Sequence, residues 1–358
     1  MNTCFAGTNM KKFLIILATT IIAGCSGNIT KLSHPQWQVQ KEGGDTSFRG
    51  LCAVDSKIVW ACGSGGTVAR TIDGGENWQI TKVPGAEATD FRDVEAFDEN
   101  TAFILGIASP ARFYKTTDGG KNWKLVYFND SNGVFFNSAH FRSSKEAIAL
   151  GDAMDGKFLI VKTNDGGDNW TELETNSRPD AIEGEGIFSA SGSNIAMPDE
   201  NKIMFVTGCT AARVFISTDK GANWSYVYAP LESGSGSNGI FSIAMKNDKE
   251  GIIVGGDYKN ENESKTNAAF TTDGGRSWKL VENNKPSGFR ECVKYLPGSD
   301  IVITVGPNGS DISYDKGKNF TRFDSGMGLH TLAVSPDGKA CWAAGRSGRI
   351  AKLFWKDR

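Results

Sequence analysis

Histidine is scarce in this sequence of 358 residues, which contains only His34, His140 and His330. After position 25 the cysteines are Cys52, Cys62, Cys209, Cys292 and Cys341, and none of them stands at the spacing of zinc ligands. The glycine-rich run GSGSNG (234–239) lies in a turn region rather than between a strand and a helix, and no nucleophile elbow is found. We therefore expect no metal site and no cofactor.

A surplus of charge of one sign is also missing. The chain has 39 Lys and Arg against 41 Asp and Glu, which gives a formal net charge of −2. Nucleic-acid-binding proteins usually carry a clear basic surplus, so we expect no nucleic-acid partner.

Only one stretch is continuously apolar, FLIILATTIIAG at 13–24, and it follows Lys11 and Lys12. It is too short for a stable membrane span and is typical of a signal peptide. The run IIAGCSG resembles the bacterial lipoprotein box, in which the cysteine is lipidated. We predict a signal peptide over 1–24, lipidation at Cys25, a lipid-anchored tether over 25–34, and a place in the cell envelope, at the periplasmic face or outer membrane. The alternative is an ordinary secretory signal that happens to contain a cysteine.

Export would permit disulfides. Cys52 and Cys62 flank an expected hairpin, symmetric about Lys57, so they could face each other across two strands. Two small buried apolar residues would give the same pattern, and the sequence leaves both readings open.

The strongest signal is a repeat. The pattern Ser/Thr-x-Asp-x-Gly-x-x-aromatic occurs six times, at intervals of 45, 47, 54, 54 and 42 residues. Its Asp and aromatic members are Asp73 and Trp78, Asp118 and Trp123, Asp165 and Trp170, Asp219 and Trp224, Asp273 and Trp278, and Asp315 and Phe320.

Around each copy the sequence reads as four short strands, such as FRGLCAV, KIVWACG, TVARTI and WQITKV over 48–83. Four antiparallel strands at this period indicate an all-β fold, a β-propeller. The repeated turn then joins the third and fourth strands, the Asp and Thr side chains bond its backbone, and Gly75 and its counterparts allow positive φ. We expect the aromatic residue to wedge between neighbouring blades.

The seventh unit, 329–355, supplies only three strands. The segment QWQVQKE (36–42) matches the fourth strands, with Trp37 in the aromatic position. We predict a monomeric seven-bladed propeller over 35–358, with an N-terminal strand that completes the last blade.

The six copies are identified as the Asp-box, or BNR, repeat, which also occurs in sialidases, xyloglucan-cleaving glycosidases and sortilin-type receptors. The sequence of the blades, including FRGL (48–51), FRDV (91–94) and FRECV (289–293), resembles the photosystem II stability and assembly factor family and its bacterial relatives. The resemblance covers 36–358. It implies a non-enzymatic assembly factor that binds its client protein through an arginine-rich patch.

Function is expected on the face opposite the Asp boxes, at the mouth of the central channel. Arg49, Arg92 and Arg290 start innermost strands there, with His330 and Asn137 near the same point of units 7 and 3. Arg112, Arg213 and Arg349 start third strands. These residues form either a positive binding patch or a set of structural ion pairs with acids such as Asp93, Glu95 and Glu291.

Acids on the same face include Asp152, Asp155, Glu183, Glu185 and Asp257. A suitably spaced pair would permit glycoside hydrolysis, and Asp152, Asp155 and Glu185 are the candidates for catalysis. The sequence therefore leaves two hypotheses: a binding and assembly scaffold for a protein or other macromolecule, and a sialidase- or xyloglucanase-like hydrolase. Two long polar segments, 174–186 and 255–267, are either functional or mobile.

Overall fold

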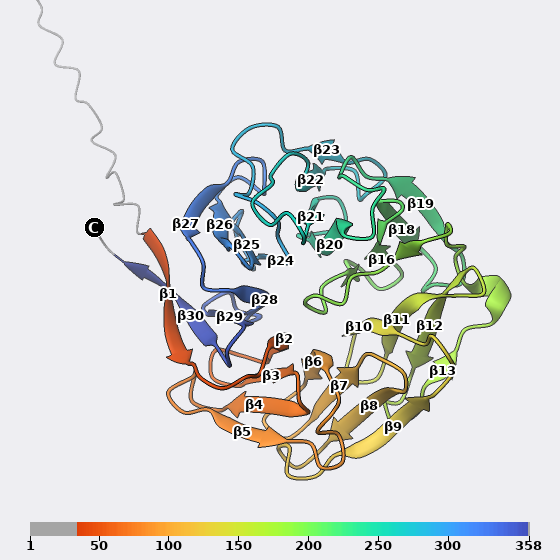
Figure 1. Cartoon of the computed structure of the whole chain (residues 1–358), viewed down its shortest axis with the longest axis vertical. Coiled ribbons are helices and arrows are strands. Elements are labelled where there is room, and N and C mark those ends of the chain that lie inside the picture. The colour runs from red at the N-terminus through yellow and green to blue at the C-terminus, as the bar shows by residue number, and fades with distance from the viewer. Residues whose placement is uncertain (1–33, 357–358) are drawn as a thin grey trace, which may run out of the picture.

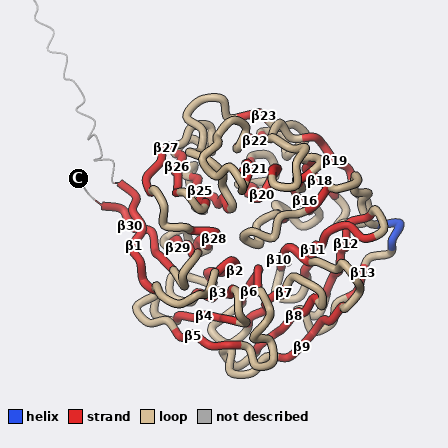
Figure 2. The backbone as a smooth tube through the Cα atoms, in the orientation of Figure 1, coloured by secondary structure: helices blue, strands red, loops and turns tan. Residues whose placement is uncertain are grey.

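β-Strands make up nearly all the regular structure in residues 34–356, the part of the chain that the computed structural model describes (Figure 2). A single short 3-10 helix, η1 (Thr175–Ser177), interrupts them. The predicted signal peptide, the lipidation site Cys25 and all of the tether except His34 lie outside the described residues.

The strands form seven sheets arranged as blades around a ring (Figure 1). Blade 1 contains β2 (Phe48–Ala53), β3 (Val59–Gly63), β4 (Thr67–Thr71) and β5 (Gln79–Lys82). Blade 2 contains β6 (Phe91–Ala96), β7 (Ala102–Gly106), β8 (Ala111–Thr116) and β9 (Lys124–Asn129). Blade 3 contains β10 (Phe136–Phe141), β11 (Ala147–Met154), β12 (Lys157–Thr163) and β13 (Thr171–Glu172). Blade 4 contains β15 (Ile195–Ala196), β16 (Ile203–Val206), β18 (Arg213–Ser217) and β19 (Ser225–Tyr228).

Blade 5 contains β20 (Asn238–Met245), β21 (Gly251–Asp257), β22 (Ala268–Thr271) and β23 (Lys279–Leu280). Two short strands come from unit 4, β14 (Glu185–Gly186) and β17 (Gly208–Cys209). They extend the sheet of blade 5 at its inner edge, next to β20. Blade 6 contains β24 (Cys292–Tyr295), β25 (Val302–Gly306), β26 (Gly309–Ser313) and β27 (Thr321–Asp324). Blade 7 contains β28 (Leu329–Val334), β29 (Cys341–Gly345), β30 (Ile350–Lys356) and the N-terminal strand β1 (His34–Lys41).

The N-terminal strand closes the ring. β1 pairs antiparallel with β30, from His34 opposite Lys356 to Lys41 opposite Ile350, and the two strands lie side by side at the outer edge of the ring in Figure 1. Trp37 is buried against blade 6, where its indole N–H donates a hydrogen bond to Ser310 Oγ at a distance of 2.9 Å. The prediction of a seven-bladed propeller completed by an N-terminal strand is confirmed.

Each Asp-box turn is held by its own side chains. Asp73 Oδ1 accepts hydrogen bonds from the Asn77 backbone N–H at 2.9 Å and from the Thr71 hydroxyl at 2.7 Å, and Thr71 Oγ1 accepts the Gly75 N–H at 3.0 Å. Gly75 has φ +93°, in the region that favours glycine. The backbone and side-chain donors of Asn77 lower the pKa of Asp73 from 3.8 to about 2. The same Asp bonds recur in the other five boxes, so the predicted turn chemistry is confirmed.

The box aromatic residues pack against the preceding blade. The Trp170 ring lies 5.2 Å from the ring of Phe103 and 5.4 Å from that of Phe113, both in blade 2. Trp123 meets Trp60 of blade 1 edge to face at 6.3 Å. The predicted wedge between blades is confirmed.

Cations fasten several blades to the box of the next one. Lys352 Nζ of blade 7 donates to Gly74 O of the first box at 3.1 Å. Lys202 of blade 4 donates in the same way to Gly274 O at 2.6 Å. Each of these ammonium groups satisfies a turn carbonyl that would otherwise need water.

Cys52 and Cys62 do not face each other. The pairing of β2 with β3 puts Cys62 opposite Gly50 and Cys52 opposite Trp60, and both cysteines are free. Cys62 is fully buried among apolar residues, so the structure favours the second of the two readings.

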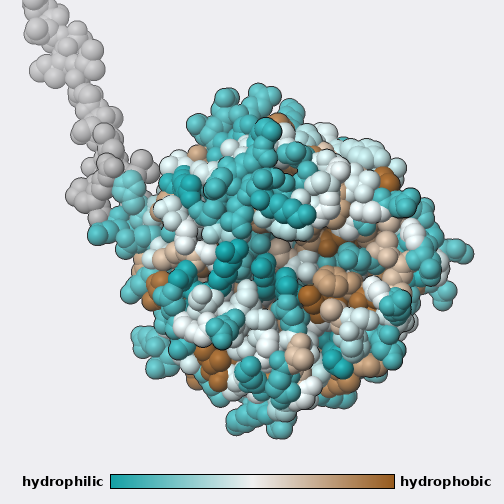
Figure 3. All heavy atoms as spheres, in the orientation of Figure 1, coloured by the Kyte–Doolittle hydropathy of each residue, from teal (hydrophilic) through white to brown (hydrophobic). Residues whose placement is uncertain are grey.

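The surface on the face shown in Figure 3 is mostly hydrophilic, with hydrophobic residues near the centre of the ring and at a few places on the rim. Within residues 34–356 no helix has the length and apolar character needed to cross a bilayer.

The Trp170 wedge predicts a large loss of stability on truncation. Trp170→Ala should lower the free energy of unfolding by about 3 to 5 kcal/mol, because it leaves a cavity between two blades. Chemical denaturation measures this. Tyr228→Ala, which removes a side chain that is 63% exposed, should change stability by less than about 0.5 kcal/mol. Equal losses in the two variants would contradict the wedge.

Candidate functional site

The innermost strands carry a β-bulge at the channel mouth. In five blades the pairing of the first two strands shifts register near the start of the first strand, and one residue is inserted there. The inserted residues are Arg49, Arg92, Asn137, Phe241 and His330. A bulge turns its extra residue away from the regular alternation of the strand. Because these strands line the centre of the ring, the five side chains meet at one end of the channel. We call them the bulge ring.

A segment of unit 4 enters the channel. Residues 187–194, which we call the plug, run into the centre of the ring before β15 begins (Figure 1). Arg92 Nη1 donates to Ser189 O at 3.0 Å, and Arg49 Nη1 donates to Ala190 O at 3.3 Å. Two of the predicted binding arginines therefore hold main-chain carbonyls of the chain itself.

The plug reaches the other blades as well. Its Ile187 N–H donates to Asp152 of blade 3 at 2.9 Å, and its Ser191 hydroxyl donates to Glu291 O of blade 6 at 2.9 Å. Ser193 Oγ lies 2.7 Å from Ser242 Oγ of blade 5, and Thr331 of blade 7 donates to Ser191 O at 3.3 Å. With Arg49 and Arg92, these contacts tie one segment to every other blade.

Gly192 is the tightest point of the plug. It has φ +65°, and a Cβ at this position would lie 2.3 Å from Asp93 Oδ1. Asp93 is buried and accepts the backbone N–H of Ala139 at 2.7 Å and of Val94 at 2.9 Å. Burial, with the nearby Glu95 charge, raises the pKa of Asp93 well above 3.8. A larger residue than glycine would have to displace this carboxyl group.

Glu291 links unit 6 to the bulge residues of the next two blades, His330 of blade 7 and Arg49 of blade 1. One of its oxygens lies 3.2 Å from Arg49 Nη1 and the other contacts His330 Nδ1. Burial alone would raise the pKa of Glu291, but the charges of His330 and Arg49 outweigh it and lower the pKa from 4.5 to about 2. Glu291 is therefore held as a carboxylate by its contacts with Arg49 and His330. Within the described residues, His330 Nε2 is buried with no hydrogen-bond partner.

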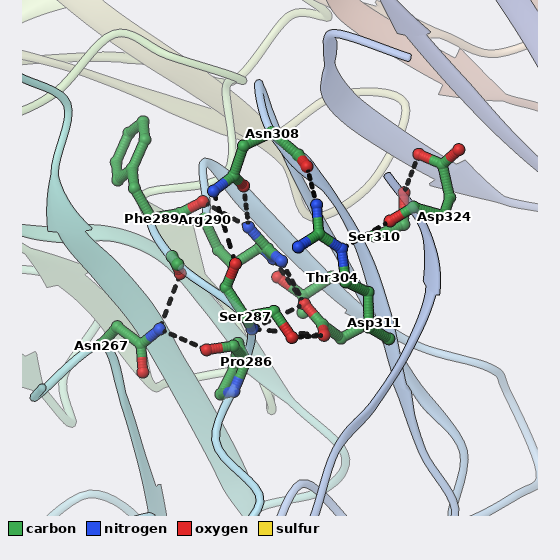
Figure 4. A network of polar contacts seen from close by, with 12 residues as sticks. Asn267, Pro286, Ser287, Phe289, Arg290, Thr304, Asn308, Ser310, Asp311 and Asp324 are labelled. Carbon is green, nitrogen blue, oxygen red and sulfur yellow. Dashed lines mark hydrogen bonds and ion pairs between the residues drawn. The ribbon is translucent and has the colours of Figure 1, made fainter. Parts of the chain in front are cut away.

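Arg290 makes its polar contacts with residues of unit 6 (Figure 4). It is fully buried, and its Nε donates to Asp311 Oδ2 at 2.7 Å while Nη1 donates to Asn308 Oδ1 at 2.6 Å. Asp311 also accepts the Ser287 hydroxyl at 3.0 Å. In this structure Arg290 joins parts of blade 6 and is not presented to a partner.

The three predicted outer arginines lie in different surroundings. Arg213 is buried, with its Nε 2.8 Å from Glu185 Oε1, and it stacks 4.4 Å from the Tyr226 ring. Arg349 pairs with Glu42 of the loop after β1. Arg112 lies over the Phe128 ring at 5.7 Å. The first two are engaged in structural ion pairs.

The candidate catalytic acids do not form an open pair. Glu185 is buried, paired with Arg213, and accepts the Thr207 hydroxyl at 2.6 Å. Asp152 accepts the Ile187 N–H and, at 3.1 Å, the Asn137 amide, and burial raises its pKa. Asp155 is exposed in the turn between β11 and β12, at φ +53°. Retaining and inverting hydrolases need two carboxyl groups facing one cleft, and this arrangement lends that reading no support.

Metal ligands do not gather in the described part of the chain: between residues 34 and 356 there is no group of three or more His, Cys, Asp and Glu side chains that could hold an ion.

The sequence reasoning missed the plug. The interval between the third and fourth Asp boxes is 54 residues against 45 for the first pair, which was the available signal of an insertion. It assigned the long polar link 174–186 as functional or mobile, but the part that enters the channel follows it. It named Glu291 as a candidate ion-pair partner of the arginines, and the structure pairs it with Arg49 and with His330, a partner that was not named.

Two family models match parts of the chain. The model described as Photosynthesis system II assembly factor YCF48 matches residues 24–110, and the model described as Sortilin, neurotensin receptor 3, matches residues 159–292. No curated protein sequence matches this chain.

Solved propellers superpose over most of the ring. A structure of YCF48 bound to D1 peptide has a TM-score of 0.62 at 16% identity, covering 90% of this chain and 97% of its own. YCF48 from Cyanidioschyzon merolae has a TM-score of 0.63 at 18% identity, covering 89% and 98%. The WD40 propeller domain of Doa1 reaches 0.61 at 12% identity, covering 89% and 97%, so the structural likeness reports the fold. The chain is a BNR-type propeller that resembles the photosystem II assembly factor.

The pKa of Glu291 predicts a pH-dependent contribution to stability. Its folded value of about 2 lies below 4.5, so its stabilisation is complete at neutral pH and is lost as pH falls towards 2. Glu291→Gln should cost about 3 kcal/mol of unfolding free energy at pH 7 and about half of that at pH 3. Denaturation of both proteins across this range measures the difference. A constant difference would show that Glu291 is not held by Arg49 and His330.

Proposed function

We propose that this chain is a non-catalytic binding and assembly scaffold that takes a segment of a protein partner at the channel mouth. A lipid on Cys25 would hold it at the cell envelope. The structure of YCF48 bound to D1 peptide supports a peptide segment as the kind of partner that such a propeller takes.

One observation carries the proposal. At the channel mouth Arg49 and Arg92 bind main-chain carbonyls of a segment that crosses the channel, so the site already has the chemistry for holding a peptide. Their side chains are 19% and 22% exposed. Of the three guanidinium nitrogens of Arg49, only Nη1 has hydrogen-bond partners within the described residues. Nε and Nη2 are therefore left for a carbonyl or carboxylate group of a partner.

An aromatic cluster from blade 5 packs on the same plug segment. Phe188 of the plug stacks on Phe241 with ring centroids 3.7 Å apart, and Tyr258 meets Phe188 edge to face at 6.2 Å. Tyr258 is 43% exposed. Aromatic and arginine side chains together are the residues that contribute most at protein interfaces.

Crosslinking from the mouth tests this function. A photo-reactive phenylalanine in place of Tyr258 should capture one protein in native membranes, while the same group in place of Tyr228, which lies on the outer strand of blade 4, should not. A synthetic peptide that spans the captured segment should then bind wild-type protein. Arg49→Ala should weaken its Kd by about tenfold or more, because the unpaired Nε and Nη2 donors of Arg49 are lost.

Thermal denaturation must show that the Arg49→Ala protein is folded. The same captured proteins at both positions, or peptide affinity that Arg49→Ala leaves unchanged, would remove the channel mouth as the site. Hydrolysis of a polysaccharide by wild-type protein, lost in Asp152→Asn, would favour the hydrolase instead.

A further inference from the structure

The chain enters the propeller on the Asp-box face. Each box turn leads directly into an outermost strand, and Trp37 of β1 holds the same place as the box aromatics. The start of β1 at His34, which pairs with Lys356 at the end of β30, therefore lies at the box side of blade 7. The channel mouth is at the opposite face.

Two large apolar side chains lie exposed where β30 meets the start of β1. Phe354 and Trp355 are each 39% exposed and pair with Gln36 and Pro35. Because neighbouring residues of a strand point to opposite sides of the sheet, Trp355 faces blade 6 and Phe354 faces blade 1. The Trp355 ring lies 6.4 Å from that of Tyr314 in the box of blade 6.

The boxes on either side of blade 7 extend this surface. The second residue of each box is exposed, and in four of the six boxes it is polar. These four are Thr117, Asn164, Thr218 and Thr272. In the boxes of blades 1 and 6 the residues are Ile72 and Tyr314, which are 50% and 45% exposed.

Tyr314, Phe354 and Trp355 thus form an apolar arc over blades 6 and 7, and Ile72 is a further exposed apolar residue on the same face, in the box of blade 1. The arc is centred on the strand that continues towards the N-terminus, and Phe354 shares a cleft with the first box at Asp73 and Gly74. Exposed Lys356 follows Trp355 directly in the sequence. Aromatic residues accompanied by lysines are typical of surfaces that lie at the headgroup level of a bilayer.

The length of the preceding chain limits how far this arc can lie from an anchor. His34 lies nine positions after Cys25, with eight residues between them. Fully extended they span about 30 Å, so acyl chains on Cys25 would keep the box side of blade 7 within that distance of the bilayer. We infer that the apolar arc docks on the lipid surface, with the channel mouth turned away from it. The inference rests on the envelope location in the proposed function.

Vesicle binding tests the arc without the anchor. A chain that starts at Ser26 keeps every described strand, and it should sediment with vesicles of phosphatidylcholine and phosphatidylglycerol. Phe354→Ser with Trp355→Ser should lower its partition coefficient about tenfold, because two half-exposed apolar side chains are lost from the contact. The matched control is Tyr226→Ser with Tyr228→Ser, an exposed aromatic pair on blade 4 that should change the coefficient less than twofold.

A second measurement uses the acylated full-length protein in vesicles that contain brominated lipid. Tryptophan emission should be quenched in wild type, and Trp355→Phe should remove most of the quenching. Wild-type protein that does not bind vesicles, or binding that the arc variant retains, would overturn the inference. So would a concentration-dependent dimer that the same variant abolishes, since the arc would then meet a second copy. Capture from Tyr258 reports the channel mouth separately, so the two proposals fail independently.

Discussion

The pairing of β1 with β30 is the contact on which the rest of the molecule depends. Without it blade 7 has three strands and an open edge, and Trp37 leaves the core between blades 6 and 7. Only in a closed ring can Arg49 of the first blade reach Glu291 of the sixth, and only then does the plug find a partner on every side. The chemistry of the channel mouth is thus a product of ring closure.

The sequence predicted the parts of the fold that are set by neighbouring residues. The Asp-box turn is held by bonds between residues two to four positions apart, such as Thr71 with Asp73 and Asp73 with Asn77, so its pattern is visible in the chain. The number of blades and the N-terminal closing strand follow from counting these turns. The Phe-Arg strand starts also carried information, because the phenylalanine is buried and the next residue occupies the bulge.

The parts that sequence reasoning did not find depend on contacts between distant residues. Arg290 has the same Phe-Arg context as Arg49 and Arg92, yet its ion pair with Asp311 of β26, the third strand of the blade, draws it into the blade. The position of the plug is fixed by contacts with six other blades, and no pattern in the sequence of residues 187–194 indicates these contacts. Cys52 and Cys62 are separated by two positions of register because β2 and β3 turn about a point one residue before Lys57. A one-residue uncertainty in a hairpin is enough to change which side chains meet.

The closing seam also decides how the ring responds to force. Seven residue pairs join β1 to β30. A pull along the axis of β1 loads these pairs together, and they must yield at once. A pull at His34 directed away from β30 loads the seven pairs one after another, beginning with the pair to Lys356, so the two strands would separate one pair at a time. The same contact therefore resists force strongly or weakly according to its direction. A propeller held at its N-terminus would withstand a pull along β1 far better than a pull at His34 away from β30.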